Sequence, residues 1–443
     1  MTETYSPPRD RLASPPATRL PVATAAPLST LRGAALYIGA LLGPGLLLLP
    51  GLAAAEAGPA SVLAWAGLLV LSALFALVFA ALGRSFPSAS GVTGYVTAGL
   101  GVRAGRATAW MFLTGVVAGA PVVCLIGASY LTALTGGGQL VRAGVAALLL
   151  LVVLALAAFG LRTSSTAQLL LVGLLVAVVG AAVAGSAPAT RAANWAPFAP
   201  HGWLAVGHAA ATLMLSFVGW EAVAPLTTRF ANPARQLPRV MGIALVVTTV
   251  LYLGLAVATV GVLGDGAGTL VPLARLLRIA VGPAGLAAAA VAAVILTLAA
   301  TNAYINGAAA MATALRGDAA LRDDTARPGD TAPRRPAARL LAAIAASGLL
   351  LITAYGLGLA SPASLVAIPT TLFLSVYLGC MATAARLLPG PARWAALAAG
   401  LAVLVMLGYS GWALVIPVVV IAAAAVRPAR RRPRSSPSRP QEA

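Results

Sequence analysis

Apolar stretches of around 20 residues recur along the chain from Leu31 to Val426, with short polar breaks between them. A helix of about 20 apolar residues crosses the roughly 30 Å hydrocarbon core of a bilayer. We therefore predict an all-α polytopic membrane protein with spans near residues 31–57, 60–82, 107–134, 140–160, 166–186, 204–224, 240–263, 284–314, 338–359, 364–387, 392–409 and 411–426. Residues 1–30 and 427–443 have no apolar stretch, and we expect both to be disordered tails.

The composition excludes an ordinary soluble globule. Of the 443 residues, 60% are hydrophobic and 9% are charged, whereas soluble proteins contain roughly 25% charged residues. The two cysteines, Cys124 and Cys380, both lie inside apolar stretches, where a thiol usually packs as a small apolar group. We expect no disulfide framework, no metal site and no cofactor.

The arginines determine the predicted topology. The formal net charge is +19, and all 29 basic residues are arginines. With twelve spans and a cytoplasmic N-terminus, 25 of them fall on the cytoplasmic side, and the four outside are Arg142, Arg191, Arg275 and Arg278. Cytoplasmic loops of membrane proteins retain arginine. We therefore expect a plasma-membrane protein with both termini in the cytoplasm and no nucleic-acid partner; the arginines of the C-terminal tail can contact anionic lipid.

Two of the predicted spans have glycine and proline, within or directly after the span, at corresponding places. The first span contains Gly45 and Pro50. The sixth contains Gly219 and Trp220 and is followed by Pro225, so that Gly45 and Trp220 are 175 residues apart, as are Pro50 and Pro225. Proline removes a backbone donor and favours a kink, and an unwound backbone in a bilayer has to line a protein cavity. Matching interrupted helices in two repeats indicate a transporter whose binding site lies at the breaks, where helix N-termini attract a carboxylate.

Glu221 is the only carboxylate that lies well inside a predicted span. Ionisable groups are costly in the bilayer, roughly 2.5 to 3.5 kcal/mol at a helix centre, so this residue needs a role. A carboxyl group in apolar surroundings favours its neutral form, which makes Glu221 a candidate proton carrier. The alternative is a structural carboxylate that accepts hydrogen bonds from the amides of the broken helix. Elsewhere, the Asp323 and Asp324 pair lies in a polar loop and is interpreted as a solvated connector.

Several motifs resemble those of bacterial amino acid permeases in the amino acid, polyamine and organocation transporter superfamily. The similarity covers about residues 31–426 and is closest to exporters of methionine and branched-chain amino acids. The motifs are Gly43-Pro44-Gly45 with Pro50, Phe86–Tyr95, Phe217–Glu221, Asn232–Arg239 and, more weakly, Asn302–Ile305.

The resemblance implies a LeuT-like fold and a midplane site. Ten helices would form two inverted repeats, about residues 31–186 and 204–387, with discontinuous helices 1 and 6 and two peripheral helices at 392–426. The implied substrate-binding residues are Gly43, Pro44, Gly45, Phe217, Val218, Gly219, Trp220 and Asn302. Two departures stand out: many relatives have Ser or Thr at the position of Pro44, and acidic residues at the positions of Thr228 and Arg229.

We therefore expect a secondary active, proton-coupled transporter of neutral apolar amino acids such as methionine, leucine, isoleucine or valine, importing or exporting by alternating access. The side chains expected to line the pocket are Phe217, Trp220, Val122, Ala118 and Leu372. Glu221 is the only anionic group expected near them.

Three other classes of protein share part of this pattern. A major-facilitator drug exporter is suggested faintly by Gly101–Arg106, and a non-translocating nutrient sensor would share every feature except flux. An enzyme would need polar groups clustered at one membrane face, and the predicted spans contain none.

Overall fold

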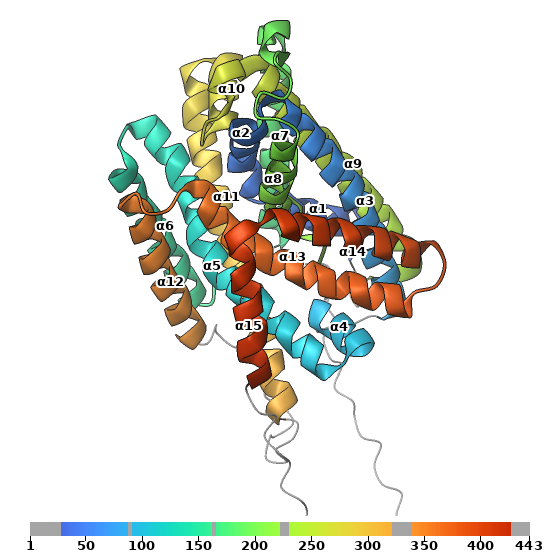
Figure 1. Ribbon diagram of the computed structural model, residues 1–443. Helices are drawn as coiled ribbons and strands as arrows, with labels where there is room; N and C mark the ends of the chain where they lie inside the picture. Colours follow the sequence, from blue (N-terminus) through green and yellow to red (C-terminus); the bar gives the residue numbers. More distant parts are fainter. Residues whose placement is uncertain (1–27, 87–90, 162–164, 222–229, 321–337, 427–443) are drawn as a thin grey trace, which may run out of the picture.

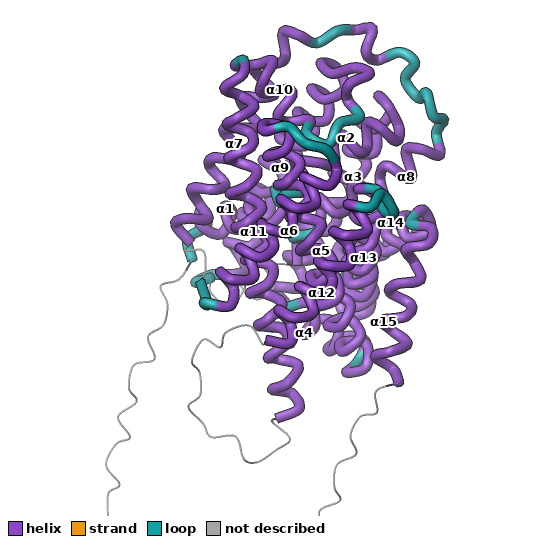
Figure 2. Tube along the Cα trace, turned by 90° about the vertical axis from the view of Figure 1, so that its left-hand side faces the viewer, coloured by secondary structure: helices purple, strands orange, loops and turns teal. Residues whose placement is uncertain are grey.

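The computed structural model describes residues 28–86, 91–161, 165–221, 230–320 and 338–426. Within these ranges the chain is almost entirely helical (Figures 1 and 2). The long helices are α3 (Ser61–Ser85), α5 (Val102–Thr135), α6 (Gln139–Ala158), α7 (Ser165–Ser186), α9 (Pro233–Leu263), α11 (Pro283–Ala320), α12 (Ala338–Gly356), α13 (Pro362–Leu387) and α14 (Pro391–Tyr409).

The helices are long and apolar enough for a multi-pass membrane protein, as the sequence predicts. In the described part of the chain, nine helical stretches meet the length and hydropathy of a membrane span, and one of these joins α2 (Gly45–Ala57) to α3. Two further apolar stretches, Leu204–Phe217 and Gly411–Ala424, are shorter. The second of these covers most of α15 (Val415–Val426).

Both predicted helix interruptions are present. In the first span, α1 (Thr30–Leu41) ends before Leu42, and α2 begins only at Gly45. In the sixth, α8 (Leu204–Leu213) tightens into the 3-10 turn η4 (Met214–Phe217), and the backbone is extended at Val218. Pro225, Thr228 and Arg229, which follow this break, lie outside the described residues.

Two short helices occur where the sequence pattern predicts only loops. They are α4 (Val92–Leu100) and α10 (Pro272–Val281), and they lie at opposite ends of the molecule (Figure 1). In α10 the apolar side chains of Leu273 and Leu276 are buried, whereas Arg275 on the polar face donates to the carbonyl of Gly266 at 3.1 Å. Such a helix is too short and too amphipathic to be recognised as a span, because only one face of it is apolar.

Helix α5 is central to the packing. It packs against α11, α13 and α6, and most of its side chains are buried. By contrast, α6 and α12 lie side by side at one edge of the molecule (Figure 1). These edge helices expose apolar side chains such as Leu148, Leu349 and Leu350. An exposed apolar surface of this kind suits contact with lipid.

The Asn-Pro motif found in the sequence begins α9. The side chain of Asn232 accepts from the amide of Arg235 at 3.3 Å, and Gln236 Oε1 accepts from the amide of Asn232 at 2.8 Å. This reciprocal arrangement satisfies donors that a helix N-terminus leaves unpaired. Gln236 Nε2 also donates to the carbonyl of Leu28 at 3.3 Å, and Leu28 bridges to Phe230. The motif therefore ties the start of α9 to the chain just before α1.

Candidate functional site

The breaks in the first and sixth spans touch each other through glycine backbones. Gly219 has φ +146°, and a Cβ atom there would lie 2.7 Å from the carbonyl oxygen of Ala40. A Cβ atom at Gly45 would lie 3.1 Å from Ser216 Oγ and 3.5 Å from its Cα. Glycine is required at 219 because other residues rarely adopt that φ and would collide with α1. The two interrupted helices thus meet without intervening side chains.

Tyrosine hydroxyls from neighbouring helices lie against carbonyl oxygens at and near the interruptions. The hydroxyl of Tyr252 on α9 lies 2.5 Å from the carbonyl oxygen of Leu41 and 2.7 Å from that of Ser216. Tyr130 on α5 donates to the carbonyl of Leu47 in α2 at 2.6 Å. Buried carbonyls far from water need such partners. The shape of the breaks is therefore held by side chains from α5 and α9.

Glu221 is buried at the second break and is hydrogen-bonded to it. Its Oε2 accepts from the amide of Gly219 at 2.9 Å and from the hydroxyl of Tyr377 on α13. The Tyr377 oxygen in turn accepts from the amide of Trp220 at 3.2 Å. Glu221 Oε1 is buried and has no hydrogen-bond partner among the described residues. The carboxyl group thus holds the unwound backbone and keeps one oxygen available.

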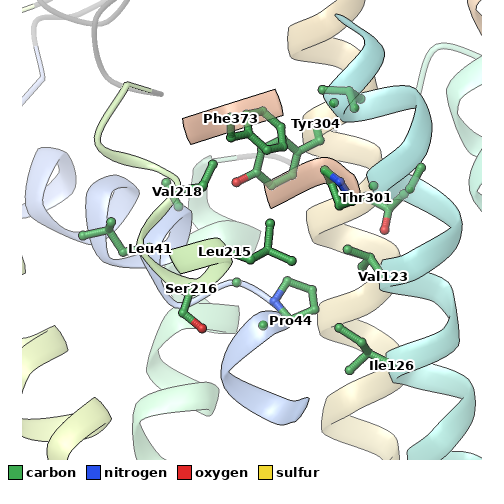
Figure 3. A pocket seen from close by; sticks show the side chains of 18 residues that line it. Leu41, Pro44, Val123, Ile126, Leu215, Ser216, Val218, Thr301, Tyr304 and Phe373 are labelled. Carbon is green, nitrogen blue, oxygen red and sulfur yellow. The ribbon is translucent and has the colours of Figure 1, made fainter. Parts of the chain in front are cut away.

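A cavity lies between the two breaks on one side and α5, α11 and α13 on the other (Figure 3). The space in and around it that no protein atom occupies, open solvent included, is about 620 Å³. The lining residues are Ala40, Leu41, Gly43, Pro44, Gly45, Gly115, Val116, Gly119, Ala120, Val123, Ile126, Leu215, Ser216, Val218, Thr301, Tyr304, Pro369 and Phe373.

Unpaired hydrogen-bond donors gather at the N-terminus of α2, beside the cavity. The amides of Leu46 and Leu47 bond to the carbonyls of Gly43 and Pro44 at 3.1 and 3.0 Å, but the amides of Gly43 and Gly45 bond to nothing in the described part of the chain. The buried hydroxyl of Ser216 likewise has no partner there. A helix N-terminus carries roughly half a positive charge. This corner of the cavity is suited to bind a carboxylate.

Of the eight residues that the sequence indicates as binding substrate, the four lining the cavity are Gly43, Pro44, Gly45 and Val218. The other four do not line it. The Phe217 ring packs on Trp65, and Trp220 Nε1 donates to Ser72 at 2.7 Å. Gly219 contacts Ala40, and Asn302 Nδ2 donates to the carbonyl of Leu161 at 2.9 Å.

The remaining expected pocket side chains are buried but do not line this cavity. On α5 the cavity is lined by Gly119 and Val123 and not by the expected Ala118 and Val122. On α13 it is lined by Phe373 and not by the expected Leu372. One residue along a helix turns the side chain by about 100°, so a one-residue shift selects a different face. Three cavity-lining residues are absent from the sequence prediction. Ser216 and Thr301 directly precede the Phe217–Glu221 and Asn302–Ile305 motifs, and Tyr304 lies inside the second motif.

Two helices broken at matching places around a small-molecule cavity are features of a membrane transporter. A family model described as Amino acid permease matches residues 28–441, and the chain belongs to this family of transporters, which are not enzymes. The match overturns the major-facilitator alternative.

Two relatives cover most of the chain. It is 33% identical to the uncharacterized amino acid permease YecA of Bacillus subtilis over 378 residues, 83% of this chain and 87% of YecA. It is 29% identical to the L-methionine/branched-chain amino acid exporter YjeH of Escherichia coli over 379 residues, 84% of this chain and 88% of YjeH.

Proposed function

We propose that the protein is a secondary active transporter of neutral apolar amino acids, and that its substrate binds where the first and sixth spans are interrupted. The observation that carries the proposal is the set of three unpaired donors, the amides of Gly43 and Gly45 and the hydroxyl of Ser216, at the edge of an otherwise largely apolar cavity. In this proposal they bind the substrate carboxylate. The amine then faces the carboxyl ends of α1 and η4, where the helix dipole is negative.

The cavity lining supports a neutral, apolar substrate side chain. Val116, Val123, Ile126 and Phe373 contribute apolar surface, and the lining contains no Asp, Glu, Lys or Arg. A cationic side chain would therefore lose its hydration without gaining an ionic partner. The relative YjeH, which is named as an exporter of methionine and branched-chain amino acids, agrees with this preference. Methionine, leucine, isoleucine and valine are the substrates we propose.

The proposed architecture is the LeuT-like fold that family membership implies. It has twelve spans: two inverted repeats of five, about residues 31–186 and 204–387, and two peripheral helices at 392–426. Both termini are cytoplasmic in this proposal, because only that orientation leaves 25 of the 29 arginines inside. The two repeats move relative to one another, so the cavity opens to one side of the plasma membrane at a time.

Proton coupling is the proposed energy source, and Glu221 the proposed carrier. The residue is buried beside the break, and its unpaired Oε1 is free to take a proton. One proton moving down about 100 mV releases roughly 2.3 kcal/mol. Each tenfold concentration ratio across the membrane costs about 1.4 kcal/mol, so this energy supports a ratio of around fifty for a neutral solute. One coupled proton per substrate is therefore sufficient.

Counterflow in proteoliposomes tests the proposed function without assuming a direction or a coupling ion. We expect vesicles preloaded with leucine or methionine to accumulate labelled leucine, and vesicles preloaded with arginine not to do so. Arginine exchange without leucine or methionine exchange would refute the apolar substrate class. Saturable leucine binding to the purified protein with no flux in sealed vesicles would indicate a sensor instead.

A further inference from the structure

The wall of the cavity formed by α5 includes three residues with small or missing side chains, Gly115, Gly119 and Ala120. Gly115, Val116, Gly119, Ala120 and Val123 all line the cavity from this helix. Their spacing of one, three and four residues places them on a single helix face. Because two glycines and an alanine lie within two turns, the α5 backbone itself borders the cavity there. The missing side chains leave room there for part of a ligand.

This wall lies across the cavity from the carboxylate-binding corner. Figure 3 shows Pro44 and Leu215, from the two interrupted spans, facing Val123 and Ile126 of α5 across the cavity. An amino acid whose carboxylate binds at Gly43 and Gly45 therefore extends its side chain toward α5. The side-chain subsite and the carboxylate site are on opposite walls, and the depth of the α5 wall limits the length of side chain that fits.

The two glycines of the wall differ in what surrounds them. A Cβ atom at Gly115 would press on the Phe373 ring, with contacts of 3.2 to 3.4 Å. A Cβ atom at Gly119 would meet only Pro369 Cβ, at an ordinary 3.5 Å. Gly119 and Val123, one turn apart, are also only partly buried, whereas Gly115 is buried. The Phe373 ring therefore fills the space beside Gly115, whereas Gly119 faces open space.

We propose that Gly119 is the specificity-determining residue of the side-chain subsite. Its missing side chain accommodates the ends of long apolar side chains such as those of leucine and methionine, and any added bulk at 119 fills that space. Side chains as short as that of alanine do not reach it. This inference rests on the proposed function and assigns its substrate selectivity to one position.

The test compares selectivity in Gly119→Ala and Gly119→Val by counterflow with leucine, methionine and alanine. One methylene in an apolar pocket discriminates substrates by about tenfold or more. We expect the leucine-to-alanine ratio of kcat/KM to fall about tenfold in Gly119→Val, through a higher KM for leucine, while the KM for alanine is unchanged. Gly119→Ala, which adds one methyl group without a clash, gives a smaller change in the same direction and covers the case in which Gly119→Val does not fold.

Matched glycine substitutions away from the cavity provide the control. Gly144→Ala in α6 and Gly173→Ala in α7 add a methyl group with no other atom within 4 Å, and we expect both to keep the wild-type ratio. An unchanged ratio in the Gly119 variants, or an equal loss for all three amino acids, would overturn the inference while the proposed function stands. A wild-type protein that moves none of the three would refute both.

Discussion

Removing the hydroxyl of Tyr252 tests whether side chains from neighbouring helices hold the two breaks in shape. The change Tyr252→Phe keeps the ring, which packs between Trp65 and Phe217 with centroids 5.1 and 5.2 Å away. It removes the donor that lies within hydrogen-bonding distance of the carbonyls of Leu41 and Ser216. The perturbation is therefore confined to one polar group in a buried site.

The expected magnitude follows from the single proton of a tyrosine hydroxyl. Although two carbonyls lie within reach of it, only one full hydrogen bond exists at a time. Leaving one buried acceptor unpaired costs about 1 to 3 kcal/mol. We expect Tyr252→Phe to lower the free energy of unfolding by about this amount, not twice as much. The KM for leucine should rise, because Leu41 and Ser216 both line the cavity.

Equilibrium unfolding in mixed micelles measures the loss of stability, and counterflow measures the KM. Tyr409→Phe is the control, because its ring packs on His208 and its hydroxyl makes no hydrogen bond in the described part of the chain. We expect the control to match the wild type in both measurements. If Tyr252→Phe also matches it, the hydroxyl does not hold the breaks together, and the argument from unpaired carbonyls is wrong.

Three further predictions concern the breaks themselves. Gly219→Ala should fold poorly or lose several kcal/mol of stability, because φ +146° is strained for alanine and its Cβ atom would lie 2.7 Å from the Ala40 carbonyl; normal yield and melting behaviour in detergent would contradict this. Ser216→Ala removes a donor to a charged group, worth about 1.5 to 3 kcal/mol, so the KM for leucine should rise about tenfold or more with little loss of protein stability; an unaltered KM would remove Ser216 from the carboxylate site. Glu221→Gln should abolish stimulation of transport by a pH gradient and keep counterflow, whereas persistent stimulation would assign coupling to another group.

The positions of the breaks could be predicted because their causes are local. Gly43, Pro44 and Gly45 disfavour a continuous helix whatever surrounds them, and the structure ends α1 at Leu41 and restarts the helix at Gly45. The long spans were predictable for the same reason, since hydropathy over about 20 residues is a property of the chain itself. The membrane class and the family followed from such local features.

The faces that the helices turn inward were decided only by tertiary packing. Ala118 and Gly119 are adjacent in the sequence and equally compatible with a membrane helix, yet Gly119 lines the cavity and Ala118 does not. The choice depends on the rotation of α5 against α11 and α13, which is set by contacts between residues far apart in the chain. Likewise, no local pattern pairs Tyr377 with Glu221, 156 residues away. Local residue chemistry sets where the helices break. The fold sets which atoms surround the resulting space, because packing between distant segments leaves no local periodic signal.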